Sequence, residues 1–241
     1  MPNSEKDQAY AQEMADKLCK YAFSKRHEFH FHGNVAEPED AIKQAVEFDG
    51  SPVFVTDSGD NVGSGADGFN TYILHQVLNL KDTHGKQFLF SGIVDKNAYA
   101  YLYDKEVGTH VDFTLGANLD ELCKSVEVHG TIVAKGIAHK LYEDRKDIGT
   151  AITVKFDDAP VSVIVEYDAI QYTDLDQYPC SHLNIDDYDV IIPKQGYISD
   201  DFKKYGKLCI MSLTQGPAYQ RSEKLELNVS YVLCSLMMIL N

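Results

Sequence analysis

The sequence predicts an α/β fold in which a mixed sheet with flanking helices contains a run of antiparallel strands in the middle of the chain. Apolar runs typical of buried strands alternate with helical patterns before residue 110 and again after residue 190. Between them, alternating segments are separated by Gly, Asn, Asp and Pro turn residues. The length of 241 residues, with 44% apolar and 24% charged residues, suits one large domain or one and a half smaller ones.

The first half of the chain alternates helices and strands. Ala11, Met14 and Leu18 recur at near-helical spacing, and Pro38 stands in the first turn of a second helix beside acidic residues. The expected elements are helix 8–24, helix 37–48, strand 52–55, helix 71–80, strand 87–94 and helix 97–105.

The second half begins with strands and returns to α/β. The expected elements are strands 110–115, 125–134, 151–156 and 161–167, strand 190–193, helix 200–205 and strand 207–213. For the domains, we expect a helical linker over 1–50, the main domain over 51–227 and an atypical tail over 228–241.

The net charge and the spacing of the cysteines limit the classes of partner and the cellular compartment that the sequence allows. The net charge of −15 argues against nucleic acid and anionic membranes as partners, because both require a basic face. Five cysteines lie far apart without a C-x-x-C pair, which favours a reducing compartment. The polar start does not resemble a signal peptide, and the apolar run 229–240 is too short to span a bilayer. We therefore expect a cytoplasmic protein.

A loop rich in Gly and Asp follows the strand at 52–55 and is the strongest local signal of a site. Its candidate residues are Asp57, Asp60, Asn61, Gly63, Gly65 and Gly68. Glycines let backbone N–H groups converge on an anion, whereas the carboxylates suit a metal, a water molecule or a substrate ammonium. The same residues are also ordinary turn formers between a strand and a helix, and the sequence leaves both interpretations open. As a turn, Asp60 would contribute about 1 kcal/mol to stability.

Three histidines, His27, His30 and His32, stand close enough in sequence to suggest a zinc or nickel site. The segment around them is polar and has no flanking cysteine, so a solvated linker is the favoured interpretation. The sequence has no serine-hydrolase or zincin motif. We therefore assign no catalytic residue and no metal ligand.

Three segments resemble one known family. In PVFVTDSGDNVGSGADGFNTYILHQVL, six residues match a D-x-x-D-N-P-x-G-G-x-x-G-D-x-T pattern: Asp57, Asp60, Asn61, Gly65, Gly68 and Thr71. Val62 and Phe69 replace its proline and its last acidic residue. Together with VGTHVDFTLGANLD and VIIPKQGYISDDFKKYGKLCIMSLTQGPAYQ, this segment resembles the C-terminal domain of the MlrC family, the microcystinase C-like metallopeptidases.

The resemblance implies a two-domain peptide-bond hydrolase whose zinc is held by acids and histidines of an N-terminal domain. No histidine of this chain falls on a matching ligand position, so no cofactor is expected here. In the family, the loop 57–68 would face the interdomain cleft, and Lys194 is a candidate for substrate contact.

The chain is therefore expected to be a truncated C-terminal domain without catalysis of its own. Alternatives are one subunit of a split hydrolase, whose partner is a separately encoded metal-binding domain, and a module that binds a small molecule or peptide through the loop 57–68. Self-association through the helix with Leu18 and Phe23 is a further expectation, because a missing domain would leave an apolar patch.

The last residues depart from the family. The end NVSYVLCSLMMILN does not resemble the family's tail, K-R-I-x-R-P-M-x-P-x-D. A one-base change of reading frame near 225–228 would restore a similar string, so we expect a frameshift there.

Overall fold

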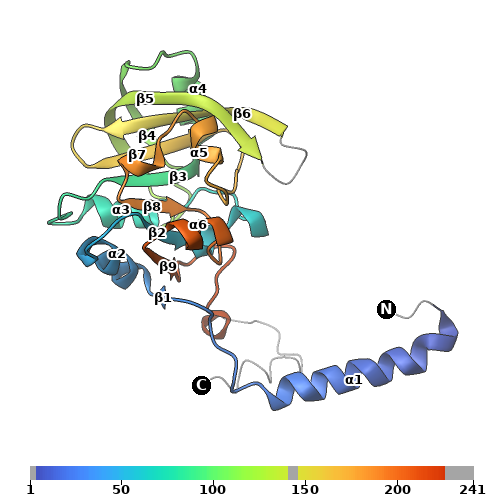
Figure 1. Cartoon of the computed structure of the whole chain (residues 1–241). Coiled ribbons are helices and arrows are strands. Elements are labelled where there is room, and N and C mark those ends of the chain that lie inside the picture. The colour runs from blue at the N-terminus through green and yellow to red at the C-terminus, as the bar shows by residue number, and fades with distance from the viewer. Residues whose placement is uncertain (1–3, 141–145, 226–241) are drawn as a thin grey trace. The chain divides into compact units, whose positions relative to one another are not determined.

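The computed structural model describes residues 4–140 and 146–225 and divides the chain into two compact units (Figure 1). One unit comprises residues 1–32 and 221–241, and the other comprises residues 33–220. The predicted domain boundaries at 51 and 228 stay predictions, and the proposed frameshift after residue 225 lies outside the described residues.

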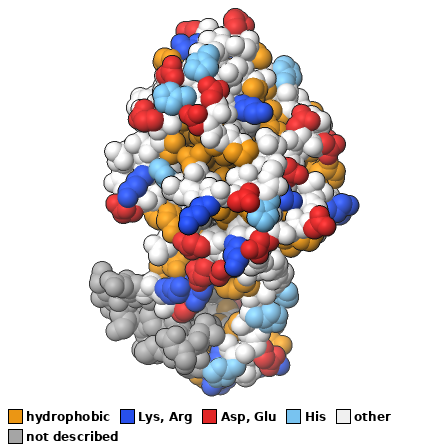
Figure 2. Space-filling view, turned by 90° about the vertical axis from the view of Figure 1, so that its left-hand side faces the viewer, with side chains coloured by type: hydrophobic (Ala, Val, Ile, Leu, Met, Phe, Trp, Pro, Cys, Tyr) orange, Lys and Arg blue, Asp and Glu red, His pale blue; other side chains and the backbone are white. Residues whose placement is uncertain are grey.

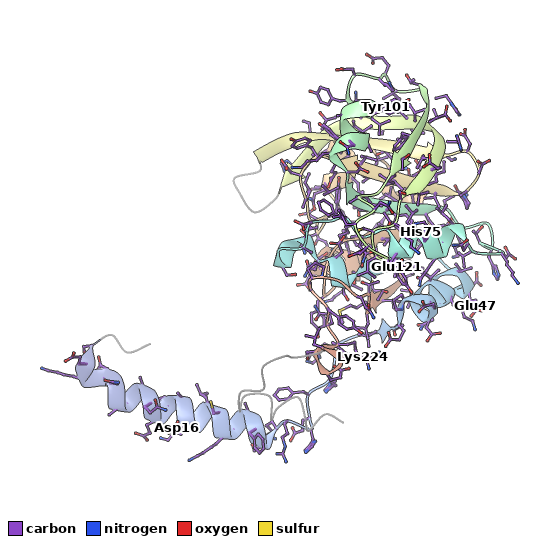
Figure 3. All side chains as sticks on the ribbon, turned by 180° about the vertical axis from the view of Figure 1, so that it is seen from behind. Asp16, Glu47, His75, Tyr101, Glu121 and Lys224 are labelled. Atoms are coloured by element: carbon purple, nitrogen blue, oxygen red, sulfur yellow. The ribbon has the colours of Figure 1, made fainter. Side chains whose placement is uncertain are left out.

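The smaller unit contains the helix α1 (Gln8–Ser24), which covers the predicted range. None of its residues is buried, although Tyr10, Leu18 and Tyr21 are large apolar side chains. Ion pairs such as Lys17 with Glu13, one turn apart at 2.7 Å, lie along the helix. Figure 3, which labels Asp16, shows the side chains projecting along α1.

The larger unit is built around one nine-stranded mixed sheet. Its strands lie in the order β1-β9-β2-β8-β3-β7-β6-β5-β4. The bounds of the strands are β1 (Val35–Ala36), β2 (Val53–Asp57), β3 (Phe88–Val94), β4 (His110–Leu115), β5 (Val126–Lys140), β6 (Lys146–Phe156), β7 (Val161–Glu166), β8 (Val190–Pro193) and β9 (Leu208–Ser212). The pairs from β1 through β7 are parallel, and those from β7 through β4 are antiparallel.

Among the described residues of this unit, five α-helices flank the sheet. They are α2 (Pro38–Glu47), α3 (Tyr72–Leu78), α4 (Lys96–Tyr103), α5 (Gln177–Cys180) and α6 (Asp200–Tyr205). The predicted fold, a mixed sheet with flanking helices and a run of antiparallel strands, is confirmed. The strand β1 and the helix α5 were not predicted, because elements of two and four residues are too short to show a period.

Two apolar cores lie on opposite faces of the sheet. Val53 and Val55 of β2 face a core that includes Ala41 and Ala45 of α2, whereas Phe54 faces the core with Phe202 of α6. Neighbouring residues of a strand point to opposite faces, so a strand buried on both sides is apolar throughout. This explains why the parallel strands appear in the sequence as short unbroken apolar runs.

The surface mixes both signs of charge. On the face in Figure 2, acidic side chains are interspersed with lysines, arginines and histidines. Figure 3 labels Tyr101 on α4, which lies at the antiparallel end of the sheet. Of the helices that the structure describes, none is long and apolar enough to span a membrane.

Candidate functional site

The carboxyl ends of β9, β2 and β8 meet at one edge of the sheet, because these three strands are parallel neighbours. Asp57 ends β2, Lys194 directly follows β8, and Thr214 comes two residues after β9. In open α/β sheets, ligand sites lie at this edge. The loop 57–68, predicted as the site, therefore starts where the fold favours one.

Lys194 is the centre of a buried ionic network. Its ammonium donates hydrogen bonds to Asp57 Oδ2 at 3.1 Å, to Asp60 Oδ2 at 2.7 Å and to the backbone oxygen of Asn70 at 2.7 Å. The Lys194 side chain is 4% exposed and both carboxylates are 3% exposed. An ammonium has three donors, so all of them are used. Substrate contact by Lys194 stays a prediction, and it would require this network to open.

Asp57 and Asp60 are each held by further donors. Thr214 Oγ1 donates to Asp57 Oδ1 at 2.5 Å, and the backbone N–H of Gly59 donates to Thr214 Oγ1 at 2.8 Å. The backbone N–H of Gly68 donates to Asp60 Oδ1 at 3.0 Å, and that of Asn70 donates to Asp60 Oδ2 at 2.7 Å. Asp60 thus closes the loop on itself and is not an exposed turn residue.

The pKa values in this network depend on burial and on the presence of two carboxylates beside one ammonium. Burial raises the pKa of Asp57, Lys194 acts in the opposite direction, and the neighbouring charge of Asp60 raises it further. Burial alone would lower the pKa of Lys194, but the charges of Asp57 and Asp60 together raise it. The ammonium is therefore held in its charged form.

The outer part of the loop is shaped by Asn61 and the glycines. Asn61 Oδ1 accepts from the backbone N–H of Gly63 at 3.1 Å and from Nε2 of Gln171 at 2.9 Å. Gly65 and Gly68 have φ values of +95° and +80°, a region that favours glycine. These residues therefore fix the course of the backbone.

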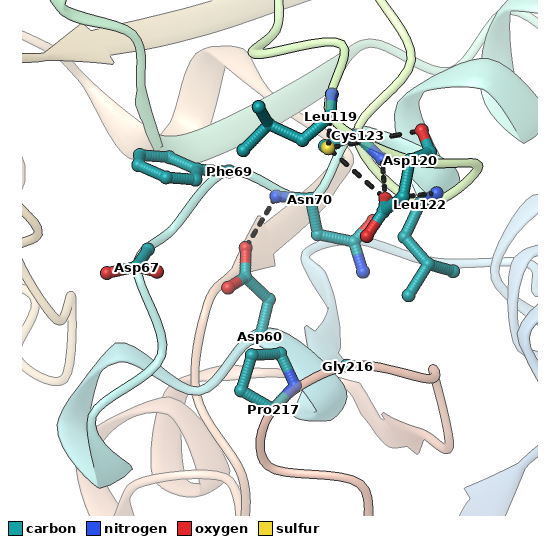
Figure 4. Close-up of a pocket in the computed structure, with 10 residues that line it drawn as sticks. All are labelled: Asp60, Asp67, Phe69, Asn70, Leu119, Asp120, Leu122, Cys123, Gly216 and Pro217. Carbon is teal, nitrogen blue, oxygen red and sulfur yellow. Dashed lines mark hydrogen bonds between the residues drawn. The ribbon is translucent and has the colours of Figure 1, made fainter.

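A pocket of about 150 Å³ lies beside this network (Figure 4). Asp67 and Phe69 stand on one side, Asp120 and Leu122 on another, and Pro217 lies across from them. The buried Asp60 and Asn70 lie at the pocket wall. The network thus positions the loop that forms part of the pocket.

The histidine cluster does not assemble into a metal site. The rings of His30 and His32 lie 5.4 Å apart, and Nδ1 of His30 is 2.8 Å from the backbone oxygen of Glu28. Across residues 4–140 and 146–225, no group of three His, Cys, Asp or Glu residues is arranged to hold a metal ion. The three histidines therefore do not form, among the described residues, the zinc or nickel site that their spacing suggested.

The sequence analysis singled out Asp57, Asp60 and Lys194 as candidates but did not predict the contacts that join them. Thr214 and Asn70 were not predicted, and the two carboxylates were considered for ligands outside the chain. A usable signal existed, since a lysine directly after the buried strand β8 and an aspartate at the end of β2 should meet if the strands are parallel neighbours.

The comparisons with known proteins agree with the fold. No curated protein matches the sequence. The chain is similar to the crystal structure of a "Putative metallopeptidase" from Mesorhizobium sp. BNC1, with a TM-score of 0.71 and 17% identity over 90% of this chain. The matched part is 44% of that protein, so the chain spans less than half its length. Residues 55–228 match the family described as MlrC C-terminus, and the chain therefore belongs to the MlrC family through this C-terminal domain.

Proposed function

We propose that this chain is the C-terminal domain of an MlrC-like zinc peptide-bond hydrolase and that it does not catalyse hydrolysis alone. Family membership and the alignment to 44% of a longer protein support this proposal. The observation that carries it is the Lys194 network. The two buried carboxylates of the loop after β2 are bound to one ammonium, so they serve to shape the loop.

In this proposal the domain contributes one wall of a cleft, and the chemistry belongs to the metal-binding domain. A catalytic zinc takes about three protein ligands and keeps one open position. The described residues offer no such set, so the proposal assigns the hydrolytic step to the metal-binding domain. The pocket beside Asp60 is the surface that would face the substrate.

The test is reconstitution. The purified chain alone is expected to hold no stoichiometric zinc and to hydrolyse no peptide. Adding a separately produced N-terminal half of a two-domain family member is expected to restore hydrolysis. That result would support the alternative in which this chain is one subunit of a split enzyme. One tightly bound zinc per chain, lost when His30 and His32 are both replaced by Ala, would overturn the proposal.

The second candidate function is a binding module for a small molecule or peptide. The pocket of about 150 Å³ favours it, because a cavity at the carboxyl edge of parallel strands is a common ligand site. Ligand binding by the isolated chain, without any added partner, would support this candidate. The DNA upstream of Met1 separates truncation from a split enzyme, since a complementing metal-binding half would be encoded there.

A further inference from the structure

The pocket beside the Lys194 network has walls that are largely carbon. Phe69, Leu119, Leu122 and Pro217 contribute apolar surface to it, and Leu119 is 73% exposed. A cavity of about 150 Å³ accommodates a group of roughly six carbon atoms, the size of benzene. The walls and the volume together suit a short hydrocarbon segment.

The charges around this pocket have one sign. Among the ten lining residues there is no Lys, Arg or His, whereas Asp67 and Asp120 are both exposed to solvent. Figure 4 shows these two residues on opposite sides of the pocket. Lys194 lies behind the wall, and the buried carboxylates of Asp57 and Asp60 that it contacts offset its charge, so it does not reverse the field. A depression lined by one sign of charge attracts the opposite sign.

Both exposed carboxylates are suited to a charged guest. The thiol of Cys123 and the backbone N–H of Leu122 donate to Asp120 and lower its pKa, so it stays ionised near neutral pH. Asp67 makes no hydrogen bond or ion pair with any residue that the structure describes. The carboxylate of Asp120 is therefore fixed in place, and that of Asp67 is available to interact with a ligand.

The lining excludes other guests. An anion would meet carboxylates and no cation. A metal ion would need at least three converging ligands, and no such group occurs among the described residues. A wholly apolar ligand would make no favourable electrostatic interaction with the carboxylates of Asp67 and Asp120. A cation with an attached hydrocarbon chain satisfies the charges and the carbon walls together.

We propose that this pocket binds a primary alkylammonium group of about four carbons, the chemistry of a lysine side chain. The methylene groups pack against Phe69 and Leu122, while the ammonium is held by the negative field of the carboxylates of Asp67 and Asp120 on the two sides of the pocket. Identifying this group as part of a peptide substrate rests on the proposed function, but the binding itself does not.

The test is a titration of the purified full chain followed by NMR shifts or calorimetry. The probe is n-butylammonium chloride at low ionic strength, with n-butanol and sodium chloride as matched controls. The expected result is saturable binding with a dissociation constant in the millimolar range, and added salt should weaken this binding. Asp67→Asn and Asp120→Asn are each expected to weaken binding about two- to fivefold, the effect of removing one exposed ionic partner.

Asp104→Asn is the control variant, because Asp104 is an exposed carboxylate outside the pocket. Nα-acetyl-lysine methylamide, which carries a butylammonium side chain, is expected to bind, and alanine amide, which carries only an α-ammonium, is expected to bind more weakly. Binding of n-butanol as tight as that of n-butylammonium, or equal affinity in wild type and both pocket variants, would overturn the proposal. Either result would leave the reconstitution test of the proposed function unaffected.

Discussion

The ammonium of Lys194 lies 2.7 Å from the carboxylate of Asp60, a residue 134 positions earlier in the chain, and both side chains are almost fully buried. The contact joins the end of β8 to the loop after β2. The loop cannot reach its observed course by local turn geometry alone, because its central carboxylate is satisfied partly by this distant lysine. The network is therefore a structural support for the pocket.

Replacing Lys194 by Met should destabilise the larger unit strongly. The substitution would leave Asp57 and Asp60 buried without their cation, and breaking a buried pair in this way costs about 3–5 kcal/mol. Urea unfolding monitored by circular dichroism measures the loss. Lys203→Met is the matched control, because Lys203 is 54% exposed and lies 3.5 Å from Asp200, so its loss should cost less than about 0.5 kcal/mol. Similar losses for both variants would show that the network contributes little.

Replacing Gly59 by Ala should also destabilise the site, by a steric effect. A Cβ at Gly59 would overlap the backbone oxygens of Thr214 and Gln215, and backbone atoms have little room to move. Gly65→Ala is the comparison, since a Cβ there meets no atom within 4 Å and only the strain of its φ of +95° applies. In thermal unfolding, the melting temperature of Gly59→Ala should lie well below that of Gly65→Ala. The opposite order would mean that the backbone at Thr214, just after β9, can shift.

The fold was predictable because the strands and helices have clear periods. Buried strands such as β2 and β8 appear as apolar runs, and α2 begins with a proline beside acidic residues. Strand order was not predictable, since no local pattern shows that β9 lies between β1 and β2. The same limit applies to the site. The loop 57–68 was visible in the sequence, but its hydrogen bonds to Lys194 and Thr214 depend on which strands are neighbours.

Replacing Glu166 by Gln should change how stability depends on pH. Glu166 ends β7 and is 1% exposed; Oε1 accepts from the hydroxyl of Tyr172 at 3.0 Å, and Oε2 has no hydrogen-bond partner among the described residues. Burial raises its pKa well above the ordinary value of 4.5. The folded protein then keeps a proton that the unfolded chain has released, so stability falls as pH rises above about 4.5, by up to about 1.4 kcal/mol per pH unit.

In the Glu166→Gln variant the side chain at position 166 is neutral at every pH, so the variant should lack this decline in stability. Urea unfolding at pH 5 and pH 7 measures the difference between the two proteins. Glu47→Gln is the control, because Glu47 lies on the surface with its side chain 59% exposed. If wild type and Glu166→Gln lose stability in parallel between the two pH values, Glu166 is ionised in the folded protein and its burial has been offset.

Replacing Leu18 by Glu should reduce self-association of the chain. Leu18 is 69% exposed on α1, and Tyr10 and Tyr21 are 66% and 64% exposed on the same helix. Since i, i+3, i+4 and i+7 spacings share one helix face, Leu18 and Tyr21 belong to a common stripe with Met14. Phe23, the other predicted contact, is 40% exposed and stacks with the guanidinium of Arg26 at 4.2 Å. Exposed apolar stripes of this kind favour association in water.

Sedimentation velocity over a range of protein concentrations measures the association. Wild type is expected to show a sedimentation coefficient that rises with concentration, and Leu18→Glu is expected to show a smaller rise. Gln12→Glu adds the same negative charge to the polar side of α1, where Gln12 bonds Asp16 at 2.8 Å, and should behave like wild type. This control separates loss of the apolar contact from general charge repulsion, which matters for a chain of net charge −15. If both variants dissociate the chain equally, repulsion explains the effect, and if wild type is monomeric at every concentration, the helix face does not mediate association.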